Sequence, residues 1–248
     1  MGSVGNGNKQ STALPDDFNG LFGERKSVNV FERLDNITEN GTINPFYNVS
    51  SLYKRNCAIC ATATALQMRG YDVEAGPRDE NNWRGFNSVF DVDYVDTNNY
   101  ILPNYGGVGT YRYSGMPSES EVKNNIRASL GDDSKVQKMP KGAGPATKAI
   151  ENKVKSWGDG SYGVLSVRWK DYNSAHVVNV FNRNGQIVIY DGQINKTFTG
   201  TQALTSYMKR TIAGRTALVR LDNAPIRSDY SSDTMKKMFN KSGKKWGD

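Results

Sequence analysis

The chain has one histidine, and its position relative to two cysteines gives the first indication of chemistry. His176 lies in the segment SAHVVNV, Cys57 and Cys60 lie in NCAIC, and Asp191 lies in YDGQ. A zinc site takes four nitrogen or sulfur ligands, so this set favours neither a metal site nor a cofactor. A thiol and an imidazole can instead act as nucleophile and base, with a carboxylate to orient the base. The order Cys, His, Asp therefore predicts a cysteine hydrolase.

The segment around the first cysteine predicts a helix over residues 57–69. Its residues are mostly strong helix formers, and Gly70 follows where a helix commonly ends. Cys57 would then stand at the N-terminus of that helix, where the backbone dipole and free N–H groups lower the pKa of a thiol. The same N–H groups are candidates for an oxyanion hole.

The histidine and the aspartate are predicted to lie on neighbouring strands of one hairpin. An Asn-Gly pair at 184–185 separates two apolar, β-branched runs, which is a strong hairpin signal. Counting from this turn places Asp191 opposite Val178 or Asn179, one or two positions from His176. The carboxylate is then close enough to hold the imidazole in one tautomer.

The remaining pattern predicts an α+β fold, in which the helix with Cys57 packs on a C-terminal antiparallel sheet. The other expected elements are helices over 118–130, 145–157 and 201–212 and strands over 71–75, 162–169 and 216–221. We expect three parts: a polar N-terminal arm (1–45), a catalytic domain (46–222) and a basic C-terminal tail (223–248).

The charge of the chain narrows the classes of partner. The 248 residues carry a net charge of +7, which fits either general solubility or an acidic partner. No aromatic and basic platform of the kind used by single-strand binders is evident, so nucleic acid is the less favoured partner. No run approaches the roughly 18 apolar residues of a membrane span, so no membrane role is expected.

Three segments resemble one known family. They are 56–75 (NCAICATATALQMRGYDVEA), 174–180 (SAHVVNV) and 187–193 (IVIYDGQ). Together they resemble the papain-fold toxin domain, a family of glutamine deamidases found in bacterial polymorphic toxins and phage head-associated proteins. The resemblance covers about residues 45–222 and implies a papain-like fold with an intact catalytic group.

By this resemblance Cys57 is the nucleophile, His176 the base and Asp191 the acid that orients it. Gln193 completes the Asp-x-Gln motif in a supporting role. Papain has an oxyanion glutamine upstream of its cysteine, but residues 51–56 contain none, so Asn56 is only a candidate for the second oxyanion donor.

Two further features bear on the substrate pocket. Gly192 stands where the family commonly has proline, which predicts a looser turn. The segment 76–117 matches the family poorly and is expected to shape the pocket, with Trp83, Phe86 and Tyr94 as wall residues.

The sequence leaves several functions open. The first is a toxin or effector that deamidates a glutamine of a target protein through a thioester, and a papain-like peptidase would use the same intermediate. Alternatives are a structural phage-head or delivery protein with a vestigial site, and a thiol–disulfide enzyme that uses Cys60. Cys60 is otherwise a core residue, or a thiol that traps Cys57 as a disulfide on oxidation.

The resemblance also implies partners and a place of action. They are a target protein as substrate, an immunity protein, and a phage or secretion apparatus. The protein would be made in a bacterial cytoplasm or packaged with a phage, and would act in the cytoplasm of the target cell.

Overall fold

The structure is a computed structural model. It describes residues 22, 25–27, 29–41, 43–78, 89–90, 137–172, 174–224, 226 and 232–241. The expected helix over 118–130 lies outside these residues, as do the expected wall residues Trp83, Phe86 and Tyr94.

The centre of the fold is an antiparallel sheet of six strands in the order β2-β7-β3-β4-β5-β6. The strands are β2 (Gln137–Lys138), β3 (Tyr162–Arg168), β4 (Ala175–Arg183), β5 (Gln186–Asp191), β6 (Lys196–Thr199) and β7 (Ala217–Arg220). The expected hairpin joins β4 to β5, and its turn residues Asn184 and Gly185 have the positive φ angles of 52° and 78° that favour Asn and Gly there.

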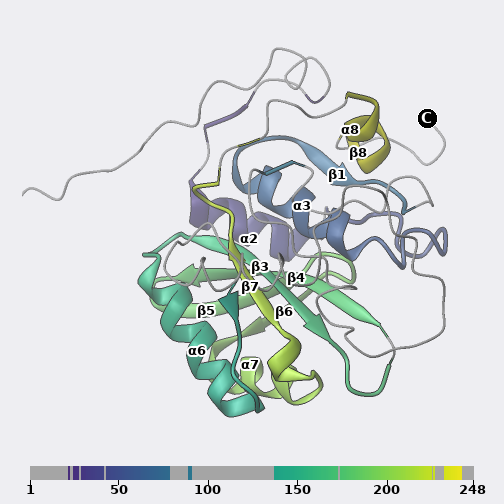
Figure 1. The fold of residues 1–248 in the computed structure, drawn as a ribbon. Helices are drawn as coiled ribbons and strands as arrows, with labels where there is room; N and C mark the ends of the chain where they lie inside the picture. Colours follow the sequence, from purple (N-terminus) through teal and green to yellow (C-terminus); the bar gives the residue numbers. More distant parts are fainter. Residues whose placement is uncertain are drawn as a thin grey trace, which may run out of the picture.

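Helices cover both faces of this sheet, as Figure 1 shows. The helices α6 (Ala143–Ser156) and α7 (Gly200–Lys209) lie on one face, and α3 (Cys57–Met68) and α2 (Val30–Asn40) lie on the other. Strand β4 serves both layers because its side chains alternate. Val177 and Phe181 pack into the core on the α3 side, whereas Val178 and Val180 pack on the α6 and α7 side. The α+β class predicted from the sequence is confirmed.

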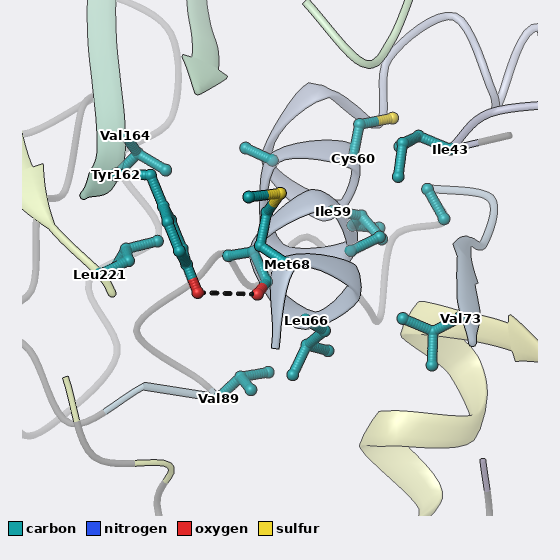
Figure 2. Packing of buried hydrophobic residues seen from close by; sticks show 14 of the residues in the cluster. Ile43, Ile59, Cys60, Leu66, Met68, Val73, Val89, Tyr162, Val164 and Leu221 are labelled. Atoms are coloured by element: carbon teal, nitrogen blue, oxygen red, sulfur yellow. Dashed lines mark hydrogen bonds between the residues drawn. The ribbon is translucent and has the colours of Figure 1, made fainter. Parts of the chain in front are cut away.

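Helix α3 is buried along nearly its whole length. Its small residues, among them Ala61, Ala63 and Ala65, let the helix lie close to the sheet. Asn179 of β4 donates to the Ala61 carbonyl (3.0 Å), and the Tyr162 hydroxyl donates to the Ala65 carbonyl (3.3 Å), as the dashed line in Figure 2 shows. These contacts fix the helix against β3 and against β4, the strand that carries the histidine.

Segments at both ends of the chain are part of the folded core, which differs from the expected arm and tail. Leu34 and Ile37 of α2 are fully buried. At the other end, β8 (Phe239–Lys241) pairs with β1 (Val73–Ala75), and α8 (Ser232–Met238) precedes it. Met235, Met238 and Phe239 are buried. A truncation at residue 230 would therefore remove core residues. The division of the chain into three parts stays a prediction.

The expected elements within the described residues differ mainly at their ends. Helix α6, expected over 145–157, begins at Ala143, and α7 ends at Lys209 rather than at residue 212. The short strands β2 and β6 were not predicted. None of the helices in the described part of the chain is long and apolar enough to cross a membrane.

Candidate active site

Three separate elements bring the predicted catalytic side chains to one corner of the sheet. Cys57 is the first residue of α3, His176 is the second residue of β4, and Asp191 is the last residue of β5. His176 and Asp191 are 8% and 4% exposed, and Cys57 is half-buried. Cys57 is thus the most exposed residue of the three.

The hairpin register places the carboxylate beside the imidazole. Asn179 pairs with Tyr190, so the next pair outward is Val178 with Asp191, as the turn count predicted. Asp191 lies diagonally across from His176 on the same face of the sheet, because side chains two positions apart share a face. The His176 Nε2 and Asp191 Oδ2 atoms are 2.6 Å apart, which is a short, charge-assisted hydrogen bond.

The other ring nitrogen of His176, Nδ1, is left for the thiol. Burial alone would raise the pKa of Cys57, but a hydrogen bond with His176 and the charge of that ring lower it below its ordinary value. The Val177 backbone N–H and the charge of Arg78 act in the same direction. Cys57 therefore has the surroundings of a reactive thiol.

The imidazole responds in the opposite sense. Burial alone would lower the pKa of His176, but its hydrogen bonds with Asp191 and Cys57 raise it to about 10. A lowered thiol pKa beside a raised imidazole pKa favours the thiolate–imidazolium pair over the neutral thiol and imidazole. Such a pair holds both the nucleophile and the proton that a leaving group needs.

An aromatic side chain that sequence reasoning missed covers the histidine. Trp169 stacks on His176 with ring centroids 5.7 Å apart and planes at 27°. Tyr207 meets the same indole edge-on, and the Arg210 guanidinium lies 5.0 Å from its centre. The register of the strands explains the contact: Val167 pairs with His176, and Trp169 follows two positions later, just past the end of β3.

Asn56, the candidate oxyanion donor, and Gln193, the expected supporting residue, are placed differently. The Asn56 amide donates to the Gly76 carbonyl (2.9 Å) and to Asn44 Oδ1 (3.3 Å), so both of its N–H bonds are used inside the protein. Gln193 reaches the start of α3 with its side-chain amide. Gly192, between Asp191 and Gln193, is closely packed rather than loosely placed: a Cβ there would lie 3.0 Å from Ile43 and 3.1 Å from Thr64.

The second thiol is isolated from solvent. Cys60 is 1% exposed and packs in the core cluster near Ile43, on the side of α3 seen in Figure 2. Its sulfur lies 3.2 Å from Asn56 Oδ1. Burial raises the pKa of Cys60 well above its ordinary value, and the nearby charges of Cys57 and Asp191 add to the rise. Cys60 therefore lacks the surroundings of a reactive thiol.

Among the described residues, no group of three or more His, Cys, Asp or Glu side chains is arranged to hold a metal ion.

Comparisons with known proteins bear on the same residues. No curated protein sequence matches the chain. One similar solved structure is the crystal structure of the Pseudomonas avirulence protein AvrPphB, with 14% identity and a TM-score of 0.27 over 40% of this chain and 68% of that chain. A likeness that slight carries no argument.

The informative comparison is with a protein family. Residues 108–196 match the family described as papain fold toxin 1, glutamine deamidase. This segment contains His176 and Asp191, whereas Cys57 lies before it, so the prediction that Cys57 is the nucleophile is supported only by the geometry described above. The resemblance inferred from the sequence is confirmed: over residues 108–196 the chain is similar to the papain-fold toxins of the glutamine deamidase family.

Proposed function

We propose that this protein is a cysteine amidohydrolase, a toxin or effector that deamidates a glutamine side chain of a target protein. The observation that carries the proposal is the Cys57–His176–Asp191 group, in which the thiol pKa is lowered and the imidazole pKa is raised. The family match supplies the choice of glutamine, since it covers the histidine and the acid and is described as a glutamine deamidase.

The reaction follows from the protonation states of the pair. The Cys57 thiolate attacks the Cδ carbon of the substrate amide, and the carbonyl electrons move to the oxygen. The His176 imidazolium gives its proton to the nitrogen, which leaves as ammonia when the tetrahedral intermediate collapses to a thioester. Asp191 accepts the hydrogen bond of the His176 Nε2–H throughout and so keeps Nδ1 directed at the sulfur.

Hydrolysis of the thioester completes the cycle. Neutral His176 takes a proton from a water molecule, and the resulting hydroxide adds to the thioester carbon. The thiolate of Cys57 is expelled, the substrate carries glutamate in place of glutamine, and His176 is again protonated. A papain-like peptidase would share every step except the identity of the leaving group.

The biological setting is part of the same proposal. The substrate is a protein inside the target cell, and the enzyme reaches it from a producing bacterium or from a phage that packages it. An immunity protein that covers the site around Cys57 protects the producer. A structural phage-head role with an inactive site is the alternative that loss of Cys57 would leave unaffected.

A mass-spectrometric experiment tests the proposal. The full chain and its Cys57→Ala variant are incubated with a bacterial lysate, and peptides are searched for Gln-to-Glu changes, which add about 1 Da. We expect such changes with the parent protein and none with the Cys57→Ala variant. New peptide termini in place of mass shifts would assign a peptidase, and identical digests from both proteins would contradict a cysteine hydrolase.

A further inference from the structure

We propose that Gln193 is a positioning residue that ties the start of α3 to the catalytic hairpin, by accepting the backbone N–H groups of Asn56 and Cys57. The proposal rests on the proposed function, because it concerns how the two halves of that site are held together. Gln193 is 9% exposed, and its side chain reaches across from the turn that follows β5.

The orientation of the Gln193 amide follows from its neighbours. With its oxygen toward α3, it accepts from the N–H of Asn56 and from the N–H of Cys57, both at 3.0 Å. The opposite orientation would turn an NH2 group toward those two donors, with only a 3.4 Å contact to Asn56 Oδ1 in return. Two donors need an acceptor, so we assign the oxygen to this side.

The start of α3 needs such a partner. The first N–H groups of a helix have no partner within the helix, and a side chain at the N-cap position usually accepts one of them. Asn56 holds that position but makes no capping bond, because its amide is directed to Asn44 and Gly76. Gln193 accepts from a distant turn the N–H groups of the N-cap residue Asn56 and of the first helical residue Cys57.

The backbone of Gln193 is itself fixed on both sides. Its carbonyl accepts from Asn44 Nδ2 at 2.9 Å, and its N–H donates to Asp191 Oδ1 at 3.1 Å. The two carboxylate oxygens of Asp191 thus hold different partners, Gln193 through Oδ1 and His176 through Oδ2. Contacts therefore run from His176 through Asp191 and Gln193 to Cys57, and the thiol–imidazole hydrogen bond closes the ring.

This ring has a consequence for the oxyanion. The sequence predicted that the N–H groups at the start of α3 would stabilise it, but the Cys57 N–H is already donated to Gln193. The role of Gln193 is therefore to set the distance and direction between the sulfur and the imidazole. A small misplacement of such groups is enough to slow a reaction strongly.

The first test needs no substitution. Amide hydrogen exchange is measured on the full chain at the start of α3, where helix-terminal N–H groups ordinarily exchange quickly. We expect the Cys57 and Asn56 amides to be protected by roughly 100-fold or more relative to an unstructured chain. Exchange of both at the unstructured rate would overturn the assignment.

The second test uses matched variants. Gln193→Met keeps the side-chain length and removes the acceptor, and Gln202→Met, at an exposed position of α7, is the control for the same exchange of side chains. We expect Gln193→Met to lose the amide protection and to slow iodoacetamide labelling of Cys57 at pH 6.5 by roughly tenfold, the effect of about one pKa unit. Labelling equal to that of Gln202→Met, with protection retained, would overturn the proposal.

A third variant keeps the outcome readable if Gln193→Met does not fold. Gln193→Glu retains an oxygen acceptor, so amide protection at Cys57 should return to that of the parent protein. A loss of protection in a folded Gln193→Glu would count against the acceptor role. Slow labelling of Cys57 in the parent protein would contradict the proposed function. If the Asn56 and Cys57 amides were still protected in that case, the contact of Gln193 with the start of α3 would stand without the proposed function.

Discussion

The two cysteines of α3 lie one helical turn apart, yet their surroundings differ in every respect that matters for reactivity. Cys57 is half-buried and meets the imidazole of His176, which lowers its pKa. Cys60 is buried in the core, where burial raises its pKa well above the ordinary value. A C-x-x-C pattern therefore does not make two equivalent thiols, and the contrast argues against a thiol–disulfide enzyme in which both must react.

Removal of the nucleophile should have the largest effect. Cys57→Ala is expected to abolish glutamine deamidation, because no other described thiol touches His176. The protein should stay folded, since the side chain is half-buried and small. Ammonia release from a glutamine substrate, with circular dichroism as the folding control, measures both. Activity retained in this variant would refute a Cys57 thioester.

Loss of the imidazole should erase the difference between the two thiols. In His176→Ala the Cys57 pKa is expected to rise above its ordinary value of about 8.5, because burial alone raises it, and activity should fall by roughly 100- to 10,000-fold. In the parent, activity should rise with pH through the lowered Cys57 pKa and fall as His176 loses its proton near pH 10. A pH–rate profile unchanged in the variant would contradict this account.

The acid should act through the imidazole. Asp191→Asn is expected to move the His176 pKa from about 10 toward 6.5 and to lower activity by roughly tenfold or more. Because the chain has one histidine, NMR titration of its ring protons reports this pKa without ambiguity. The direction of the His176 pKa shift also predicts how the stability of the fold depends on pH. The stabilisation that accompanies the raised pKa is fully present below pH 6.5 and is lost as the pH rises through about 10. An unshifted histidine titration would remove Asp191 from the group.

The aromatic cover should contribute less. Trp169→Ala removes the ring that stacks on His176, so water reaches the ion pair and weakens it. We expect activity to fall by less than about tenfold and stability by about 2 kcal/mol. Trp169→Phe, which keeps an aromatic ring, should recover most of both. Thermal unfolding and labelling of Cys57 check the two effects, and a fully active, equally stable Trp169→Ala would speak against the role.

The buried thiol should matter least for activity. Cys60→Ala is expected to keep activity within about twofold and to lower stability by about 1 kcal/mol, because a small core group is lost. Denaturant unfolding measures the change in stability, and the ammonia assay measures the change in activity. An inactive but folded Cys60→Ala would revive the dithiol hypothesis.

The ease of prediction from sequence differs between the two halves of the site. His176 and Asp191 belong to one hairpin whose turn fixes the register, so counting residues was sufficient. The helix with Cys57 was also visible in its composition. Its approach to His176 depends on contacts such as Asn179 with Ala61, 118 residues apart in sequence, which no local pattern encodes.

The unpredicted features either depend on long-range contacts or lie on the exposed surface. The many lysines near the C-terminus led to the prediction of a polar tail there. The apolar residues among them, Met235, Met238 and Phe239, are buried where β8 pairs with β1. Strand β6 is mostly exposed, so its pattern lacks the apolar alternation of a half-buried strand. The cap that Gln193 gives to α3 joins segments that no motif spacing relates.

Iodoacetamide labelling of both cysteines in one sample, across pH 5 to 9 with the adducts mapped by mass spectrometry, tests the central claim most directly. An activated Cys57 beside a protected Cys60 predicts rapid labelling of Cys57 well below pH 8 and little labelling of Cys60. Labelling of Cys57 only above about pH 8.5, or equally at both thiols, would contradict the account.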